Sequence, residues 1–120
     1  MNAKEFLSAI WAKQGNKCLV QVLPPRGKYT KPYYKHYFYP STDSALEAIE
    51  QFTAKGVTLY HACATFSAEQ RTQANAQAVK SFWADLDCGE GKPYASQKEA
   101  VLGIGAFIKA VGLPVPMIVS

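Results

Sequence analysis

Cys18-Leu-Val-Gln-Val-Leu23 and Tyr33-Tyr-Lys-His-Tyr-Phe-Tyr39 decide the fold of this chain. Both stretches are rich in β-branched, aliphatic and aromatic residues, which is typical of strands. Pro24 and Pro25 end the first strand because proline cannot donate to a strand ladder, and Pro40 ends the second. The sequence therefore predicts two strands separated by a loop over residues 24–32.

Helices are predicted on both sides of these strands, because apolar residues recur there at helical spacing. Serine–glutamate capping boxes and glycines mark the helix ends. The predicted helices span Ala3–Ala12, Ser44 to Gly56 with the box Ser44/Glu47, and Ser96 to Gly112 with the box Ser96/Glu99.

Three more apolar runs predict strands, over Val57–Phe66, Val79–Leu86 and Val115–Val119. Ser67–Gln77 is predicted as a loop or weak helix, and Cys88–Tyr94 as a glycine-rich turn. This order of elements predicts an α/β or α+β sandwich, with residues 1–120 as a single domain. The final apolar run is typical of a strand that has been cut short, and a short terminal strand is the alternative.

Composition narrows the class of protein. The 120 residues are 48% hydrophobic and 18% charged, which is typical of a globular chain. No apolar run approaches the roughly 20 residues that span a bilayer, so we expect no membrane partner. Three cysteines without a Cys-x-x-Cys pair predict reduced thiols and a cytoplasmic protein. A zinc site from His61, Cys63 and Cys88 is the alternative, but their spacing fits no standard pattern.

Charge is distributed unevenly along the chain. The net charge is +4, yet residues 1–40 carry seven basic side chains and one acid. Such a concentration suggests an anionic partner such as nucleic acid, although on charge alone a solvated basic surface is the simpler interpretation.

Basic and aromatic residues alternate between Arg26 and Tyr39. Basic groups bind phosphates and aromatic faces accept stacked bases, so this pattern predicts a single-stranded nucleic acid as partner. On a strand, the face with Tyr33, Lys35, Tyr37 and Tyr39 is expected to be exposed or ligand-facing. Tyrosines packed on the core with solvated lysines are the alternative. The candidate binding residues are Arg26, Lys28, Lys31, Tyr33, Lys35 and Tyr37.

Phe82-Trp-Ala-Asp85-Leu-Asp87-Cys-Gly89 carries the strongest signal for chemistry. Alternate side chains of a strand share a face, so Asp85 and Asp87 are expected to converge on Mg²⁺ or Mn²⁺. Such ions suit phosphoryl or nucleotidyl transfer. Two aspartates that cap the turn beside Gly89 are the alternative. Lys92, in that turn, is a candidate ligand for a triphosphate or an exposed turn lysine.

Three other polar residues are predicted to be structural. His61 is expected to be a satisfied core histidine, because it lies within an apolar run. Arg71 and Asn75 are four residues apart and are candidates for a phosphate contact, but capping of a loop is the favoured interpretation.

Ser81-Phe-Trp-Ala-Asp-Leu-Asp87, the helix after it and Gly112–Ser120 together resemble the archaeo-eukaryotic primase superfamily, in its phage and plasmid primase-polymerase form. Tyr60–Phe66 is similar to that family as well. The resemblance implies that Asp85 and Asp87 are catalytic metal ligands for Mg²⁺ or Mn²⁺. It also implies DNA primer synthesis in replication, with single-stranded DNA as template, nucleoside triphosphates as substrates and a replicative helicase domain as a further partner in the parent protein.

The family also has a nucleotide-binding histidine motif and a later acidic motif, and this sequence ends at Ser120 where the first would begin. The resemblance therefore implies the N-terminal part of a primase-polymerase-like core, truncated before its second half, and we expect the isolated chain to be inactive. A non-catalytic nucleic-acid-binding or inhibitory module is the alternative. A Toprim-like fold is disfavoured because no glutamate falls clearly at a predicted strand end.

Overall fold

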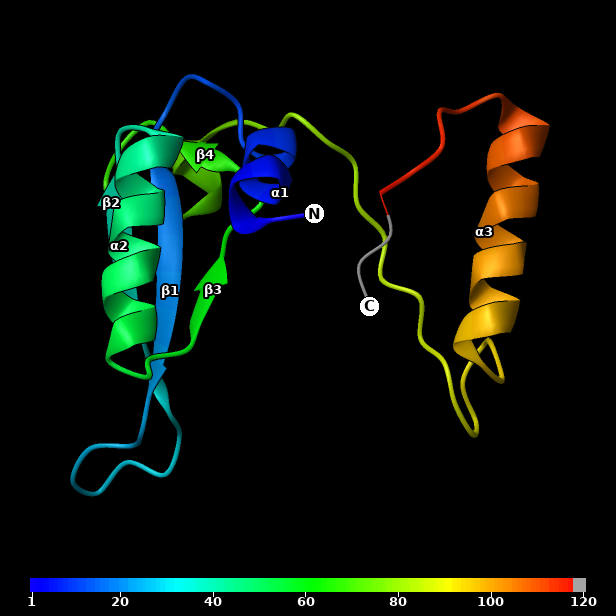
Figure 1. Ribbon diagram of the computed structural model, residues 1–120. Helices are drawn as coiled ribbons and strands as arrows, with labels where there is room; N and C mark the ends of the chain where they lie inside the picture. The colour runs from blue at the N-terminus through cyan, green and yellow to red at the C-terminus, as the bar shows by residue number, and fades with distance from the viewer. Residues whose placement is uncertain (118–120) are drawn as a thin grey trace. The chain divides into compact units, whose positions relative to one another are not determined.

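The computed structural model describes residues 1–117 and divides into two compact units, Met1–Phe82 and Trp83–Ser120. The described residues form a small mixed α+β structure with three α-helices and two antiparallel sheets (Figure 1). The predicted α+β class is thus confirmed at this level. None of the helices in residues 1–117 is long and apolar enough to cross a membrane.

The larger sheet of the first unit has the strand order β2-β1-β3, with β1 (Lys17–Leu23) in the centre. Its neighbours β2 (Tyr33–Tyr39) and β3 (Leu59–His61) both run antiparallel to it. The two strands predicted first, and the loop between them, are therefore confirmed. Leu19 lies opposite Tyr37 on one side and His61 on the other, which fixes the residues that share its face.

Helices α1 (Ala3–Ile10) and α2 (Thr42–Ala54) cover one face of this sheet (Figure 1). Helix α1 ends before the predicted Ala12, because Trp11 leaves the helical conformation and its ring is buried. The indole Nε1 of Trp11 donates to the carbonyl of Ala62 at 2.6 Å. The buried residues of this core are Leu7, Trp11, Leu19, Ala45 and Ala48.

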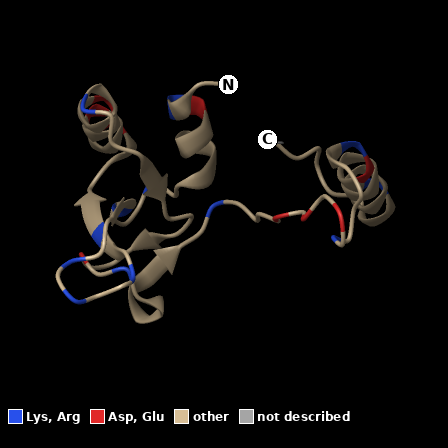
Figure 2. Ribbon diagram, turned by 90° about the horizontal axis from the view of Figure 1, so that it is seen from below, with Lys and Arg blue, Asp and Glu red and all other residues tan. Residues whose placement is uncertain are grey.

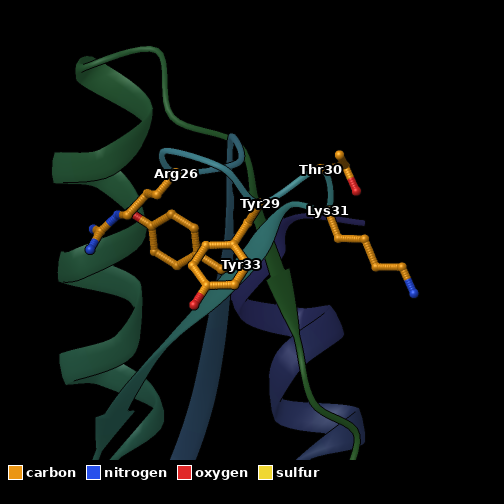
Figure 3. A pocket seen from close by; sticks show the side chains of 5 residues that line it. All are labelled: Arg26, Tyr29, Thr30, Lys31 and Tyr33. Carbon is orange, nitrogen blue, oxygen red and sulfur yellow. The ribbon is translucent and has the colours of Figure 1, made fainter.

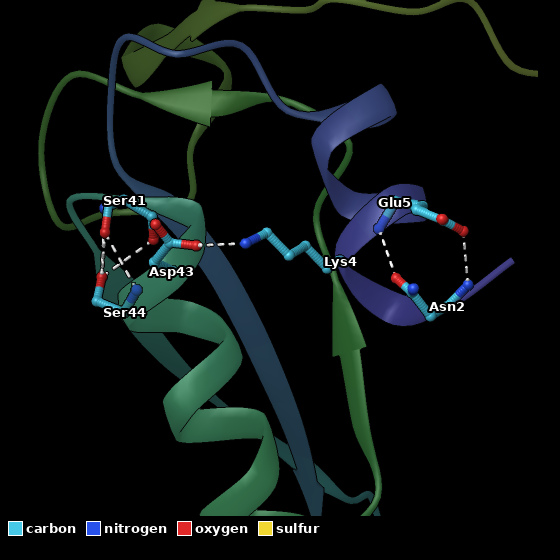
Figure 4. Close-up of polar contacts among 6 residues, drawn as sticks. All are labelled: Asn2, Lys4, Glu5, Ser41, Asp43 and Ser44. Atoms are coloured by element: carbon cyan, nitrogen blue, oxygen red, sulfur yellow. Dashed lines mark hydrogen bonds and ion pairs between the residues drawn. The ribbon is translucent and has the colours of Figure 1, made fainter.

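The N-terminus of α2 lies three residues before the predicted one. Ser41 is the N-cap: its Oγ accepts from the backbone N–H of Ser44 at 3.1 Å, and Ser44 Oγ accepts from that of Ser41 at 3.3 Å (Figure 4). The predicted Ser44/Glu47 box is therefore wrong, because Ser44 is the inner partner of a box that begins at Ser41. An exposed ion pair of 3.7 Å joins Asp43 in the first turn of α2 to Lys4 in α1.

The predicted strand Val57–Phe66 is divided into two short strands. Its first half is β3 in the larger sheet, and its second half is β4 (Thr65–Phe66), which pairs with β5 (Ala76–Ala78). Phe66 packs on Cys18, Val20 and Phe38, and so covers the sheet face opposite the helices. The predicted loop or weak helix over Ser67–Gln77 is confirmed up to Asn75, as a loop that ends in a short 3₁₀ helix, η1 (Gln73–Asn75); Ala76 and Gln77 belong to β5 instead.

The second unit contains a turn and one long helix. Helix α3 (Gln97–Val111) begins at the predicted N-cap Ser96, whose hydroxyl accepts from the N–H of Glu99, and ends at Gly112 with a φ of 72°. The predicted turn is confirmed, since Cys88 and Tyr94 form a bridge. Of the predicted strand Val115–Val119, residues 115–117 form no strand, and Ile118 and Val119 lie outside the described residues.

Candidate functional site

The loop over residues 24–32, between β1 and β2, carries a concentration of positive charge. Arg26, Lys28 and Lys31 are exposed there, and Lys35 follows on β2. No acid occurs between Phe6 and Thr42. In Figure 2 the blue of lysine and arginine is therefore concentrated on this loop. The loop, together with β1 and β2, is the hairpin that presents most of the predicted binding residues.

A hollow of about 480 Å³ lies at this loop, and Figure 3 shows the side chains that line it. The guanidinium carbon of Arg26 lies 4.1 Å from the centroid of the Tyr33 ring, a cation–π contact. The rings of Tyr29 and Tyr33 both line the hollow, whereas the Lys31 side chain extends away from them. This part of the loop can offer a cation and aromatic rings to an anionic, planar ligand. The lining residues are Arg26, Tyr29, Thr30, Lys31 and Tyr33.

The face of β2 that was expected to be exposed lies partly beneath the helices. Tyr37 and Tyr39 pack against the core, and the centroids of the Tyr37 and Phe52 rings are 5.0 Å apart. The Tyr37 hydroxyl donates to Gln21 Oε1 at 2.9 Å, and Lys35 Nζ lies 5.2 Å from the centroid of the Tyr37 ring. The predicted exposure is therefore wrong for Tyr37 and Tyr39, because α2 packs on that side of the sheet.

The opposite face of the sheet is exposed at the end near the loop. Tyr34 is 57% exposed and Tyr60 is 59% exposed, and Val22 is also exposed. Arg71 reaches this face, where its Nε donates to His36 Nε2 at 3.1 Å. Burial and the nearby Arg71 charge lower the pKa of His36, which favours the neutral imidazole that this hydrogen bond requires.

Asp85 and Asp87 lie in a segment that forms neither helix nor strand. The predicted strand Val79–Leu86 is wrong, because residues 79–86 pair with no other strand of the described residues 1–117. Phe82 and Trp83 project into solvent instead of entering a core. Both aspartates are exposed, and in Figure 2 acidic residues mark this segment. The structure therefore does not place them on one strand face, and metal binding by the pair stays a prediction.

The turn after the aspartates folds back on itself. Gly89 N–H donates to the Tyr94 carbonyl at 2.9 Å, and Tyr94 N–H donates to the Asp87 carbonyl at 3.4 Å. Lys92 lies within this turn, and its side chain is exposed. The structure therefore places Lys92 and the two aspartates in one unit, and the basic hairpin in the other.

The predicted structural residues mostly have structural contacts. His61 is half-buried, with its ring centroid 5.3 Å from that of Phe6 and 6.3 Å from that of Trp11. Asn75 stabilises its own loop, since its side-chain amide donates to the Gln70 carbonyl at 3.4 Å. The three cysteines are free, and within residues 1–117 no three His, Cys, Asp or Glu side chains are grouped as metal ligands.

No family model, curated protein or solved structure matches this chain. Sequence reasoning missed the exposed face with Tyr34 and Tyr60, although it named Arg71 as a candidate for a phosphate contact. Both faces of β2 carry aromatic residues, so hydropathy could not show which face the helices cover. The alternation of Tyr34, His36 and Phe38 was the available signal, because it separates these residues from the face that packs on α2.

Proposed function

We propose that this chain provides the metal-binding and template-binding surfaces of a DNA primase-polymerase. The parent protein would join nucleoside triphosphates on a single-stranded DNA template and release pyrophosphate. Asp85 and Asp87 carry this proposal, because both carboxylates are exposed within the segment that resembles the family motif. The basic hairpin supports it, because it can bind an anionic template strand.

The carboxylates suit a hard divalent ion in two respects. Their oxygens are the ligands that Mg²⁺ and Mn²⁺ prefer, and their exposure leaves them accessible to an ion. When bound, such an ion would activate the attacking hydroxyl and neutralise the leaving pyrophosphate. Asp85 and Asp87 would hold the ion, and Lys92 would attract the triphosphate.

Manganese-induced line broadening in the amide spectrum of the full 120-residue chain tests this proposal directly. We expect broadening centred on residues 85–91, because bound Mn²⁺ relaxes nearby nuclei. The broadening should disappear in the Asp85→Asn/Asp87→Asn chain. A Glu47→Gln/Glu50→Gln chain is the matched control: it removes two exposed acids from α2 and should leave the broadening at residues 85–91 unchanged.

Broadening spread over Glu47, Glu50 and Glu69, or none in a folded chain, would contradict the metal-binding proposal. We expect no primer synthesis by the 120-residue chain alone, because two carboxylates make only part of a two-metal site. Template-dependent incorporation that is lost on Asp85→Ala would overturn that expectation.

Nucleic-acid binding without chemistry is the second candidate. It is favoured by the difference between the two regions: the hairpin is fully formed, whereas the segment with Asp85 and Asp87 has no regular structure. This candidate and the primase-polymerase proposal both require DNA binding, and only the latter requires manganese binding by the aspartates.

A further inference from the structure

The sheet face opposite the helices carries two tyrosines that lie outside the buried cores. Phe66 of β4 covers this face where β1 begins, by packing on Cys18 and Val20. Figure 1 shows β4 at that end of the sheet and the loop of the hairpin at the other. At the loop end Tyr34 and Tyr60 are more than half exposed. Exposed aromatic rings on a sheet are a common platform for unpaired bases.

The strand register separates the two rings. Tyr34 of β2 lies opposite Val22, and Tyr60 of β3 lies opposite Val20, so β1 runs between them. Two strand spacings across and two residues along place their Cα atoms roughly 12 Å apart. Two rings at that separation are too far apart to stack on each other, and each can therefore accept a different base.

One cation lies on this face, and the loop at its end carries three more. Arg71 reaches the face and is held by the hydrogen bond to His36, which lies next to Val20 in the register. Arg26, Lys28 and Lys31 follow at the loop end, in a region of sequence that has no acid. A polyanion is the partner that this charge favours.

The tyrosine rings on the face that the helices cover already contact other side chains. Arg26 lies over the Tyr33 ring, and Tyr37 packs on Phe52 with Lys35 nearby. No such contact is found for Tyr34 or Tyr60 within residues 1–117. Bases would therefore meet free aromatic rings on the face opposite the helices.

We propose that Tyr34 and Tyr60 form a stacking platform for two bases of a single DNA strand, with Arg71 and the loop cations binding its phosphates. This site extends the proposed function. It rests on that function in one respect, which is that single-stranded DNA is the partner. It assigns the bases to the face opposite the one predicted from the sequence.

Photo-cross-linking of the full chain to an oligonucleotide tests the platform. The probe is a fluorescein-labelled strand of roughly twelve nucleotides, within the site sizes of single-strand binders, with iodouracil in place of thymine. We expect cross-links on Tyr34 and Tyr60. Binding of oligothymidylate, followed by fluorescence anisotropy, should weaken about 5- to 100-fold for each of Tyr34→Leu and Tyr60→Leu.

Two matched variants separate stacking from loss of structure. Tyr34→Phe and Tyr60→Phe keep the ring and should retain binding. Phe107→Leu removes an exposed aromatic ring from α3 and should have no effect. An abasic strand of equal length should bind the wild type and the leucine variants equally, because it offers phosphates and no bases.

Other results would overturn the platform. Cross-links confined to Tyr29 and Tyr33 would place the bases in the loop hollow, and self-association that is lost in the Tyr34→Leu and Tyr60→Leu variants would make the face a contact between copies. Either result would leave manganese binding by Asp85 and Asp87 untouched. Absence of any binding to the labelled strand would overturn both the platform and the template-binding part of the proposed function.

Discussion

Lys17 is a charged residue with a role inside the fold. Its side chain is only 1% exposed, and its ammonium group donates to the carbonyls of Lys13 at 2.6 Å and Gly15 at 2.8 Å. Burial lowers the pKa of Lys17, because the charged form loses water. Lys17 therefore holds the turn between α1 and β1, although it belongs to the basic region that suggested an anionic partner.

Replacing Lys17 with methionine should destabilise the first unit by about 1–3 kcal/mol, because partly buried carbonyls lose their donor. The measurement is the free energy of unfolding in urea. Lys13→Met is the matched control: the same change at an exposed position should shift stability by less than about 0.5 kcal/mol. Equal effects of the two substitutions would show that the Lys17 contacts contribute nothing to stability.

The pKa of His36 should respond to Arg71. Burial and the Arg71 charge both lower it from the usual 6.5, so Arg71→Ala should raise it, with burial still holding it below 6.5. Titration of the imidazole C–H resonance measures this change. Lys28→Ala, which removes a loop cation, should leave the pKa of His36 unchanged.

The lowered pKa of His36 also predicts how the stability of the fold depends on pH. Between the lowered pKa and 6.5 the unfolded chain binds more protons than the folded chain. The contribution of His36 to stability is therefore fully present above pH 6.5 and is lost as the pH falls through the lowered pKa. Urea unfolding of the wild type and of His36→Gln across this range measures it: the loss below pH 6.5 should be smaller in the variant, and an equal loss in both would contradict this assignment.

Helix α3 contains two glycines in different surroundings. A Cβ added at Gly103 would lie 2.8 Å from Cε1 of Tyr94, whereas one at Gly105 would meet no atom within 4 Å. Gly105→Ala should therefore stabilise α3 by about 0.8–1 kcal/mol, and Gly103→Ala should gain less because the Tyr94 ring must shift. Far-UV circular dichroism and the amide shifts of α3 report both effects, and equal gains would show that Tyr94 does not constrain this helix.

The two units differ in how much apolar surface they bury. The first has a core on each face of its sheet, whereas Ala100 is the one buried apolar residue among residues 83–117. A 15-residue helix with so little burial is marginal in water. We expect amide hydrogen exchange in α3 to be far faster than in β1, and Gly105→Ala to slow exchange in α3 alone. Equal opening free energies in α3 and β1 would favour the single domain predicted from the sequence.

Local patterns predicted most of the regular elements. The strands at Cys18–Leu23 and Tyr33–Tyr39, and the helix from Ser96 to Gly112, were correct because their signals are local: β-rich runs closed by prolines, and an apolar helical repeat between a serine cap and a left-handed glycine. The Asp85/Asp87 metal site was also proposed from sequence alone, on the spacing of the carboxylates and the resemblance to a family.

Predictions failed where a strand needs a partner distant in sequence. Val79–Leu86 has the composition of a strand but finds no ladder partner in the described residues, and Val57–Phe66 divides between two sheets. Strand pairing depends on which segments meet in space, and composition alone does not contain that information.

By itself, the sequence determined the strand pair, the helices that flank it, the acid-free basic loop and the two carboxylates of Asp85 and Asp87, because each depends on residues that are close together along the chain. Only the tertiary structure decided which face of β2 the helices cover. Tyrosine packs equally well in a core or at a surface, so the choice between Tyr37 and Tyr34 depended on where α2 docks.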